Sequence, residues 1–166
     1  MNLSKMNDRQ NIIIGGAIEL RDLLMISIFA IPDQPGSAGQ VLSYFGQNGI
    51  SVDFITESSN QEGAADITFC IHSSHKPRIT QFFSDLKSIT QAKQSRIMDN
   101  VAIISYYGPH FREKPAIAGQ ICQTLGRAGI NILAISTSIS SVSCVIADAQ
   151  IEAARIAISN NFEFPE

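Results

Sequence analysis

PGSAGQVLSYFGQNGISVDFITES, at residues 35–58, returns 80 residues later as PAIAGQICQTLGRAGINILAISTS, at residues 115–138, without a gap. Nine of the 24 paired positions are identical, and Gly49-Ile50 matches Gly129-Ile130. Self-similarity at a fixed spacing indicates two copies of one supersecondary unit. Each copy carries a turn with a proline, then a helix and a strand. The start of a helix is a place where a small anion binds.

Apolar patterns predict the order strand, helix, strand, strand, helix, strand in the first copy. A nearly continuous apolar run at residues 24–31 is typical of a buried strand, and residues 66–72 alternate between apolar and polar. We expect strands at residues 24–31, 50–58, 66–72 and 95–98, the last a short edge strand. Apolar residues at helical spacing predict helices within residues 38–45 and 79–89, and Gly49 is placed to end the first helix in a left-handed cap.

The second copy lacks a good candidate for its last strand, whereas the N-terminus carries a spare strand at residues 12–18. In this copy we expect strands at residues 101–107, 130–138 and 142–147, and helices within residues 117–125 and 151–158. Since sheets avoid missing partners, the N-terminal strand is predicted to complete the second sheet, with the first copy inserted in the second. The predicted domains are residues 22–99, and residues 12–21 with 100–166, after a flexible N-terminus at residues 1–11.

Composition limits the class of protein. The chain has 166 residues, 45% of them apolar and 16% charged, which suits a globular protein. Each half would bury a modest core alone, so we expect the halves to share surface or the chain to dimerise. The net charge of −3 argues against a nucleic-acid partner. No apolar run approaches a membrane span and the N-terminus lacks the core of a signal peptide, so the sequence predicts no membrane contact and a cytoplasmic protein.

The cysteines and histidines offer no catalytic or metal motif. Cys70, Cys122 and Cys144 lie far apart in apolar runs, and we expect buried structural thiols. His72 and His75 have no third ligand at a suitable spacing, and no Cys-x-x-Cys motif occurs, so no metal site is expected.

Several segments together resemble the tandem ACT domains of aspartate kinases. Residues 31–38 (IPDQPGSA), 49–53 (GISVD) and 65–69 (ADITF) are similar to the first ACT domain. Residues 129–138 (GINILAISTS) resemble the second, and residues 14–18 (IGGAI) resemble the segment that leads from the kinase domain into the second ACT sheet. The resemblance implies an α+β fold of two ferredoxin-like βαββαβ units, with antiparallel sheets and helices on one face.

The resemblance also implies a function. A tandem ACT module of this type binds a pathway end product, lysine or threonine, restrains aspartate phosphorylation and dimerises through its ACT units. Nothing in the chain resembles the phosphate-binding or aspartate-binding motifs of the kinase domain, so we expect no catalytic residue and no cofactor here, with ATP bound only by a kinase domain. The implied partner is an aspartate kinase catalytic subunit or domain, the chain being a separate regulatory subunit or the C-terminal part of a longer kinase.

Effector contacts are implied at the first turn, at one strand and in the second copy. The predicted residues are Asp33, Gln34, Pro35, Gly36, Ser37, Ala38, Glu57, Asn131 and Ile132. The backbone N–H groups at the helix start suit a carboxylate, and Gly36 permits close approach because it lacks a Cβ. Asp33 would accept a hydrogen bond from the ligand's ammonium group. Asn131 and Ile132 would add backbone groups from a facing strand, with the ligand between two ACT units.

Three departures from the family pattern leave other functions open. Glu57 stands where glutamine is usual, which favours a cationic ligand side chain such as that of lysine. Ala116 matches Gly36, so we expect a weak or empty second site around Pro115 and Ala116. Ile139 stands where a glutamate is common. The alternatives are an ACT-type dimerisation or interaction module with a decayed effector site, and a free-standing amino-acid sensor for another partner.

Overall fold

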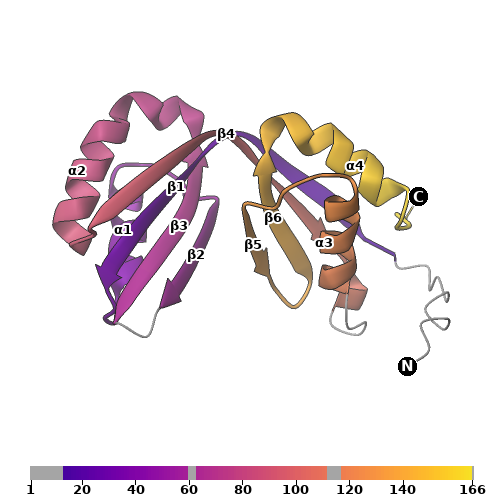
Figure 1. The fold of residues 1–166 in the computed structure, drawn as a ribbon, viewed down its shortest axis with the longest axis horizontal. Coiled ribbons are helices and arrows are strands. Elements are labelled where there is room, and N and C mark those ends of the chain that lie inside the picture. The colour runs from indigo at the N-terminus through magenta and orange to yellow at the C-terminus, as the bar shows by residue number, and fades with distance from the viewer. Residues whose placement is uncertain (1–12, 60–62, 112–116, 166) are drawn as a thin grey trace. The chain divides into compact units, whose positions relative to one another are not determined.

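A computed structural model describes residues 13–59, 63–111 and 117–165, and the chain divides into two compact units. The inserted unit is Arg21–Val101, against the predicted residues 22–99, and the flanking unit combines Met1–Leu20 with Ala102–Glu166. Within the described residues each unit has two α-helices, and Figure 1 shows them together with the strands of that unit. The N-terminal segment that the sequence predicts to be flexible, residues 1–11, lies outside the described residues.

The inserted unit has the ferredoxin-like order βαββαβ. Its elements are β1 (Gly16–Pro32), α1 (Ser37–Gln47), β2 (Phe54–Ser59), β3 (Ala64–His72), the 3₁₀ segment η2 (Ser73–Arg78), α2 (Ile79–Thr90) and β4 (Gln94–Tyr107), with β1 and β4 continuing into the flanking unit. The strand order is β2-β3-β1-β4, and β3 pairs antiparallel with both β1 and β2. Both helices appear at the predicted positions.

The core of the inserted unit lies between its sheet and its helices. Alternate residues of β1, among them Leu24, Ile26 and Ile28, are almost fully buried and join one cluster with residues of α1 and α2. The ring of Phe45 on α1 lies 5.1 Å from that of Phe69 on β3 and 5.4 Å from that of Phe82 on α2, by ring centroids. Tilted and edge-on aromatic contacts at such distances are favourable.

The flanking unit repeats this architecture with its last strand supplied from the N-terminal side. Its elements are the second part of β4, η3 (Pro109–Phe111), α3 (Ile117–Arg127), β5 (Ala134–Thr137), β6 (Ser141–Ala147), η4 (Asp148–Gln150), α4 (Ile151–Ser159) and the first part of β1. The strand order is β5-β6-β4-β1, where β4 takes the place of the first strand and β1 that of the last. Numbered in this way, both units have their strands in the order second, third, first, fourth. The predicted fold, with two such units and the first inserted in the second, is confirmed.

The strand boundaries differ from the prediction at two places. The sequence predicts breaks between residues 18 and 24 and between residues 98 and 101, but β1 and β4 each run on without one. Asp22 and Asn100 lie within these strands with φ of 56° and 54°. Short polar side chains tolerate this left-handed conformation, so one residue changes the path of the strand without ending it.

Two other predicted strands begin later than expected. Residues 50–53 and 130–133 are irregular, and pairing starts at Phe54 in β2 and at Ala134 in β5. Ile50 and Ile130 are nevertheless almost fully buried. Their apolar character serves packing beneath the end of the preceding helix, which a pattern of apolar residues does not distinguish from a strand.

The glycine pair near the N-terminus is explained by close packing. A Cβ atom on Gly16 would overlap the side chain of Tyr107, and one on Gly15 would lie 3.1 Å from the carbonyl oxygen of Tyr107. The main chain of Ile14 also donates a hydrogen bond of 2.8 Å to the carbonyl of Glu163. These contacts join the two separated parts of the flanking unit.

Two of the three cysteines are buried, as predicted. Burial raises the pKa of the Cys70 and Cys144 thiols to about 12, whereas Cys122 is only half-buried. His72 is exposed, and its ring accepts a hydrogen bond of 3.2 Å from the N–H of Ser74 at the start of η2. Within the described ranges, no helix is long and apolar enough to cross a membrane.

Candidate functional site

The turn between β1 and α1 owes its shape to a proline and a glycine. Gly36 has φ of 99° and ψ of 0°, and the N–H of Ser37 lies 3.3 Å from the carbonyl oxygen of Gln34. Pro35 and Gly36 therefore occupy the two central positions of a type II turn, the second of which requires a positive φ. The N–H of Asp33 anchors the turn by a hydrogen bond of 3.0 Å to the carbonyl of Gly63.

Ser37 holds the turn rather than facing solvent. Its side chain is 2% exposed, and its hydroxyl donates to the carbonyl oxygens of Gln34 at 3.0 Å and Pro32 at 3.4 Å. The first helical bond of α1 runs from the N–H of Gln40 to the carbonyl of Gly36, at 3.0 Å. The N–H groups of Ala38 and Gly39 precede that bond and therefore have no helical acceptor, as at the start of any α-helix.

An open cavity of about 690 Å³ lies over this helix start. It is lined by Asp33, Gln34, Pro35, Gly36, Ser37, Ala38, Gly39, Glu57 and Ser59. The turn residues predicted from the sequence and Glu57 on β2 are thus brought to one place, although they are separated by the whole of α1. Gly39 and Ser59 were not predicted; Ser59 follows Glu57 by two residues, and that spacing on a strand places both side chains on the same side.

The charges of the cavity suit a zwitterion. Asp33 and Glu57 are both exposed, and no Lys, Arg or His is among the lining residues. Two carboxylates attract a cationic group, whereas the N-terminal end of α1 attracts a negative one through its free N–H groups and its dipole. An amino acid presents both kinds of charge a few ångströms apart.

The remaining predicted contacts belong to the flanking unit. Asn131 is exposed and Ile132 is half-buried against the core of that unit, in the irregular segment between α3 and β5. The turn at Pro115 and Ala116, for which we expect a weak or empty second site, lies outside the described residues. No group of three or more His, Cys, Asp or Glu side chains is placed to hold a metal ion in the part of the chain that the structure describes.

Comparison with known proteins gives matches for both units. The ACT domain family matches residues 25–91 and again residues 104–162. The aspartokinase of Mycolicibacterium smegmatis is 29% identical over 155 residues, which is 92% of this chain and 37% of that protein. The chain therefore spans a little over a third of the length of this curated relative.

Solved structures give the same result. A structure of aspartokinase alpha and beta subunits contains a chain that matches with a TM-score of 0.78 and 27% identity, over 89% of this chain and 97% of that one. The regulatory subunit of aspartate kinase from Thermus thermophilus, in a ligand-free form, matches with a TM-score of 0.78 over 90% of this chain and 99% of that one. At 24% identity, the second likeness is one of fold.

Proposed function

Since this chain belongs to the ACT domain family, as a tandem regulatory region of the aspartate kinase type, we propose that it binds an end-product amino acid at the cavity over the start of α1. The observation that supports this most is the lining of that cavity, which combines two carboxylates with the free N–H groups of a helix start. A site of this kind matches the charges of an amino acid. Binding of an end-product amino acid there would provide feedback inhibition of an aspartate kinase.

Each part of the ligand has a partner in the proposed complex. The ligand carboxylate accepts from the backbone N–H groups of Ala38 and Gly39, where the helix dipole also favours it. The α-ammonium group donates to Asp33 in a charge-assisted hydrogen bond. Glu57, across the cavity on β2, is left for the side chain of the ligand. A second ammonium group fits there better than a hydroxyl, so we propose lysine in preference to threonine.

Ligand binding acts on an aspartate kinase only if the bound and free states differ. The further contacts that we propose, at Asn131 and Ile132, come from an ACT unit other than the one that holds Asp33. A ligand that contacts two units favours the arrangement in which both contacts are made, and this differential affinity is what allosteric inhibition requires. We propose that the chain dimerises through its ACT units and restrains a kinase domain or subunit in this way.

The primary test is calorimetric titration with lysine and with threonine, after a thermal-unfolding screen of the twenty amino acids. A ligand at 100 times its dissociation constant adds about 2.7 kcal/mol to the free energy of unfolding, which is a shift of several degrees. Asp33→Ala is expected to weaken lysine binding by about 1.5–3 kcal/mol, through loss of a charged hydrogen bond. Asp53→Ala, an exposed aspartate of the same unit outside the cavity lining, is the matched control and should leave binding unchanged.

Two further variants test separately where the ligand binds and which amino acid is preferred. Gly36→Val should abolish binding, because a β-branched residue does not adopt the φ of 99° that the turn requires. Glu57→Gln should weaken lysine more than threonine, since only lysine presents a cation there. Wild-type lysine affinity in Asp33→Ala and Gly36→Val would place the ligand elsewhere. No thermal shift with any amino acid, from a protein that still sediments as a dimer, would favour the dimerisation module with a decayed site.

A further inference from the structure

The flanking unit contains a second cavity, distinct from the one over α1. It measures about 290 Å³ and lies between α4 and the strands β1 and β4. Its apolar wall includes Ala17, Ile104, Tyr106 and Phe164, and its polar residues include Glu19 and Arg155. All of these belong to the flanking unit. A mostly apolar cavity with a few polar groups is the usual form of a small-molecule site.

Tyr106 lines this cavity and carries an unpaired polar atom. The residue is 1% exposed, and its hydroxyl has no hydrogen-bond partner among the described residues. Burial raises the pKa of this hydroxyl well above its usual range, and the negative charges of Cys144, when ionised, and of Glu19 act in the same direction. At neutral pH Tyr106 is therefore protonated and has a donor to offer. A buried donor without an acceptor is destabilising, so its presence calls for an explanation.

The inserted unit shows that the ACT core does not need this hydroxyl. The first strand of each unit carries a serine whose hydroxyl is hydrogen-bonded to a side chain of the neighbouring strand. Ser27 on β1 pairs with Thr68 at 2.9 Å, and Ser105 on β4 pairs with Ser143 at 2.7 Å, so Ser27 and Ser105 occupy matching positions. One residue further along, the inserted unit has Ile28, and the flanking unit has the tyrosine. The same packing position therefore accepts a purely apolar side chain.

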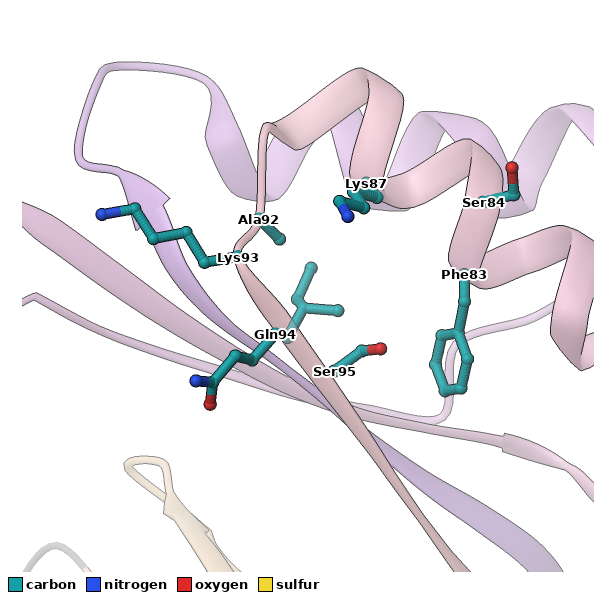
Figure 2. A pocket seen from close by; sticks show the side chains of 8 residues that line it. Phe83, Ser84, Lys87, Ala92, Lys93, Gln94 and Ser95 are labelled. Carbon is teal, nitrogen blue, oxygen red and sulfur yellow. The ribbon is translucent and has the colours of Figure 1, made fainter.

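A matching cavity of about 230 Å³ lies beside Ile28. Figure 2 shows side chains from α2 on one side of it, including Phe83 and Lys87, and those of Gln94 and Ser95 at the start of β4 on the other. Both units thus leave a gap between the second helix and the edge strand. Among the residues that the structure describes, only the cavity of the flanking unit is lined by a residue whose buried hydroxyl has no hydrogen-bond partner.

The charged residues at the second cavity disfavour an anionic ligand. The guanidinium of Arg155 binds Glu19 through three hydrogen bonds of 2.9–3.1 Å, and it also lies 3.1 Å from a carboxylate oxygen of Glu152. Two carboxylates already face this single cation. A ligand carboxylate would have to displace one of them and would gain no net pairing, whereas an uncharged ligand leaves the ion pair intact.

We propose that this cavity binds a small, uncharged and largely apolar molecule whose carbonyl or hydroxyl oxygen accepts a hydrogen bond from Tyr106 Oη. The apolar body of the ligand packs against Ala17, Ile104 and Phe164, and the Glu19–Arg155 pair stays formed at its edge. Such a ligand satisfies the buried donor that the protein leaves unpaired. This site is independent of the proposed amino-acid site, because it uses neither the turn at Asp33 nor a zwitterionic ligand.

Three probes of one shape test the chemistry. Acetophenone offers a carbonyl acceptor, ethylbenzene offers none, and benzoate is an anion. Titration of the full chain, followed by the Ile104 methyl resonance, is expected to give saturable shifts with acetophenone, weaker binding of ethylbenzene and no binding of benzoate. Tyr106→Phe should weaken acetophenone about tenfold, the loss of one hydrogen bond, and leave ethylbenzene unchanged. Tyr107→Phe is the matched control, because that neighbouring ring is 42% exposed and is absent from the lining.

The stability of the unliganded variant excludes the simplest alternative, an ordered water held by the hydroxyl. An unpaired hydroxyl predicts that Tyr106→Phe unfolds at the same or a higher temperature than wild type, whereas a bound water predicts a lower one. Absence of a saturable Ile104 shift with acetophenone, or equal weakening by Tyr107→Phe, would overturn the proposal. Lysine affinity should be the same in Tyr106→Phe and wild type. The proposal of an amino-acid site and the proposal of this second site can therefore be disproved independently.

Discussion

The backbones of the two ACT units agree in detail, even where their side chains differ. In each, a glycine with φ near +70°, Gly49 or Gly129, ends the first helix, and its N–H bonds to the carbonyl three residues earlier at 3.0 Å. The next residue, Ile50 or Ile130, bonds back five residues at 2.9 or 3.0 Å and is almost fully buried. This pair of bonds with an apolar contact is the Schellman helix end. The repeat therefore preserves the residues that fix the chain path.

The side chains on that backbone differ between the units. Phe45 lies in an aromatic cluster in the inserted unit, and the matching position of the flanking unit holds Leu125 in an aliphatic core. Outside the cores, Glu57 on β2 is matched by Thr137 on β5. The same backbone fold therefore accommodates different core side chains and different surface charges. Differences in ligand preference between the units must come from positions at which the two copies of the repeat differ.

The largest expected effect comes from breaking the two cores at the matched position. Phe45→Ala should lower the free energy of unfolding by about 3–5 kcal/mol, since it opens a cavity and removes ring contacts. Leu125→Ala should cost about 2–5 kcal/mol in the flanking unit, through the smaller volume lost. Urea unfolding followed by circular dichroism measures both. A cost below about 1 kcal/mol for Phe45→Ala would mean that the aromatic cluster is not what holds the inserted unit together.

A smaller effect should be equal in both units. Gly49→Ala and Gly129→Ala should each cost about 1–2 kcal/mol, because an L residue is strained at these positive φ values. No atom lies within 4 Å of either added Cβ, so backbone conformation is the whole cost.

Helical glycines of the same two units provide the control. Gly46→Ala and Gly126→Ala, in α1 and α3, also point into open space and should stabilise the protein by about 0.5–1 kcal/mol. Costs at Gly49 and Gly129 that differ by more than about 1 kcal/mol would show that the shared helix end is not equally important in the two units.

The sequence was sufficient for the fold because the repeat, the helical periodicity and the turn residues all pointed to one topology. Gly49 and Gly129 had a recognisable role, as did the proline and glycine of the turn at Gly36. The strand ends were less predictable: Ile50 and Ile130 look like strand residues, yet they pack beneath a helix. The continuity of β1 through Asp22 depends on a single φ angle, and composition carries no signal for it.

The candidate site was predictable in its turn and less so in its surroundings. The motif at residues 33–38 and the position of Glu57 came from a resemblance, and the structure brings them to one cavity. Ser59 was missed because an exposed serine at the end of a strand is unremarkable without its neighbours. Tyr106 was missed as well, since a tyrosine in an apolar strand is expected to be an ordinary core residue. Only the structure shows that its hydroxyl lacks a partner among the described residues.

The smallest expected effect concerns the second helix, where the two units differ in charge. Arg155 on α4 is 55% exposed and bonds to Glu19 on β1, whereas Lys87 on α2 has no carboxylate within ion-pair distance among the described residues. A double-mutant cycle with Arg155→Met and Glu19→Gln should give a coupling of about 0.2–1 kcal/mol that falls as salt is added. Lys87→Met should cost less than about 0.5 kcal/mol at any salt concentration. Coupling that stays constant in high salt would mean that the Glu19–Arg155 pair is shielded from solvent and holds β1 to α4 more firmly than an exposed pair.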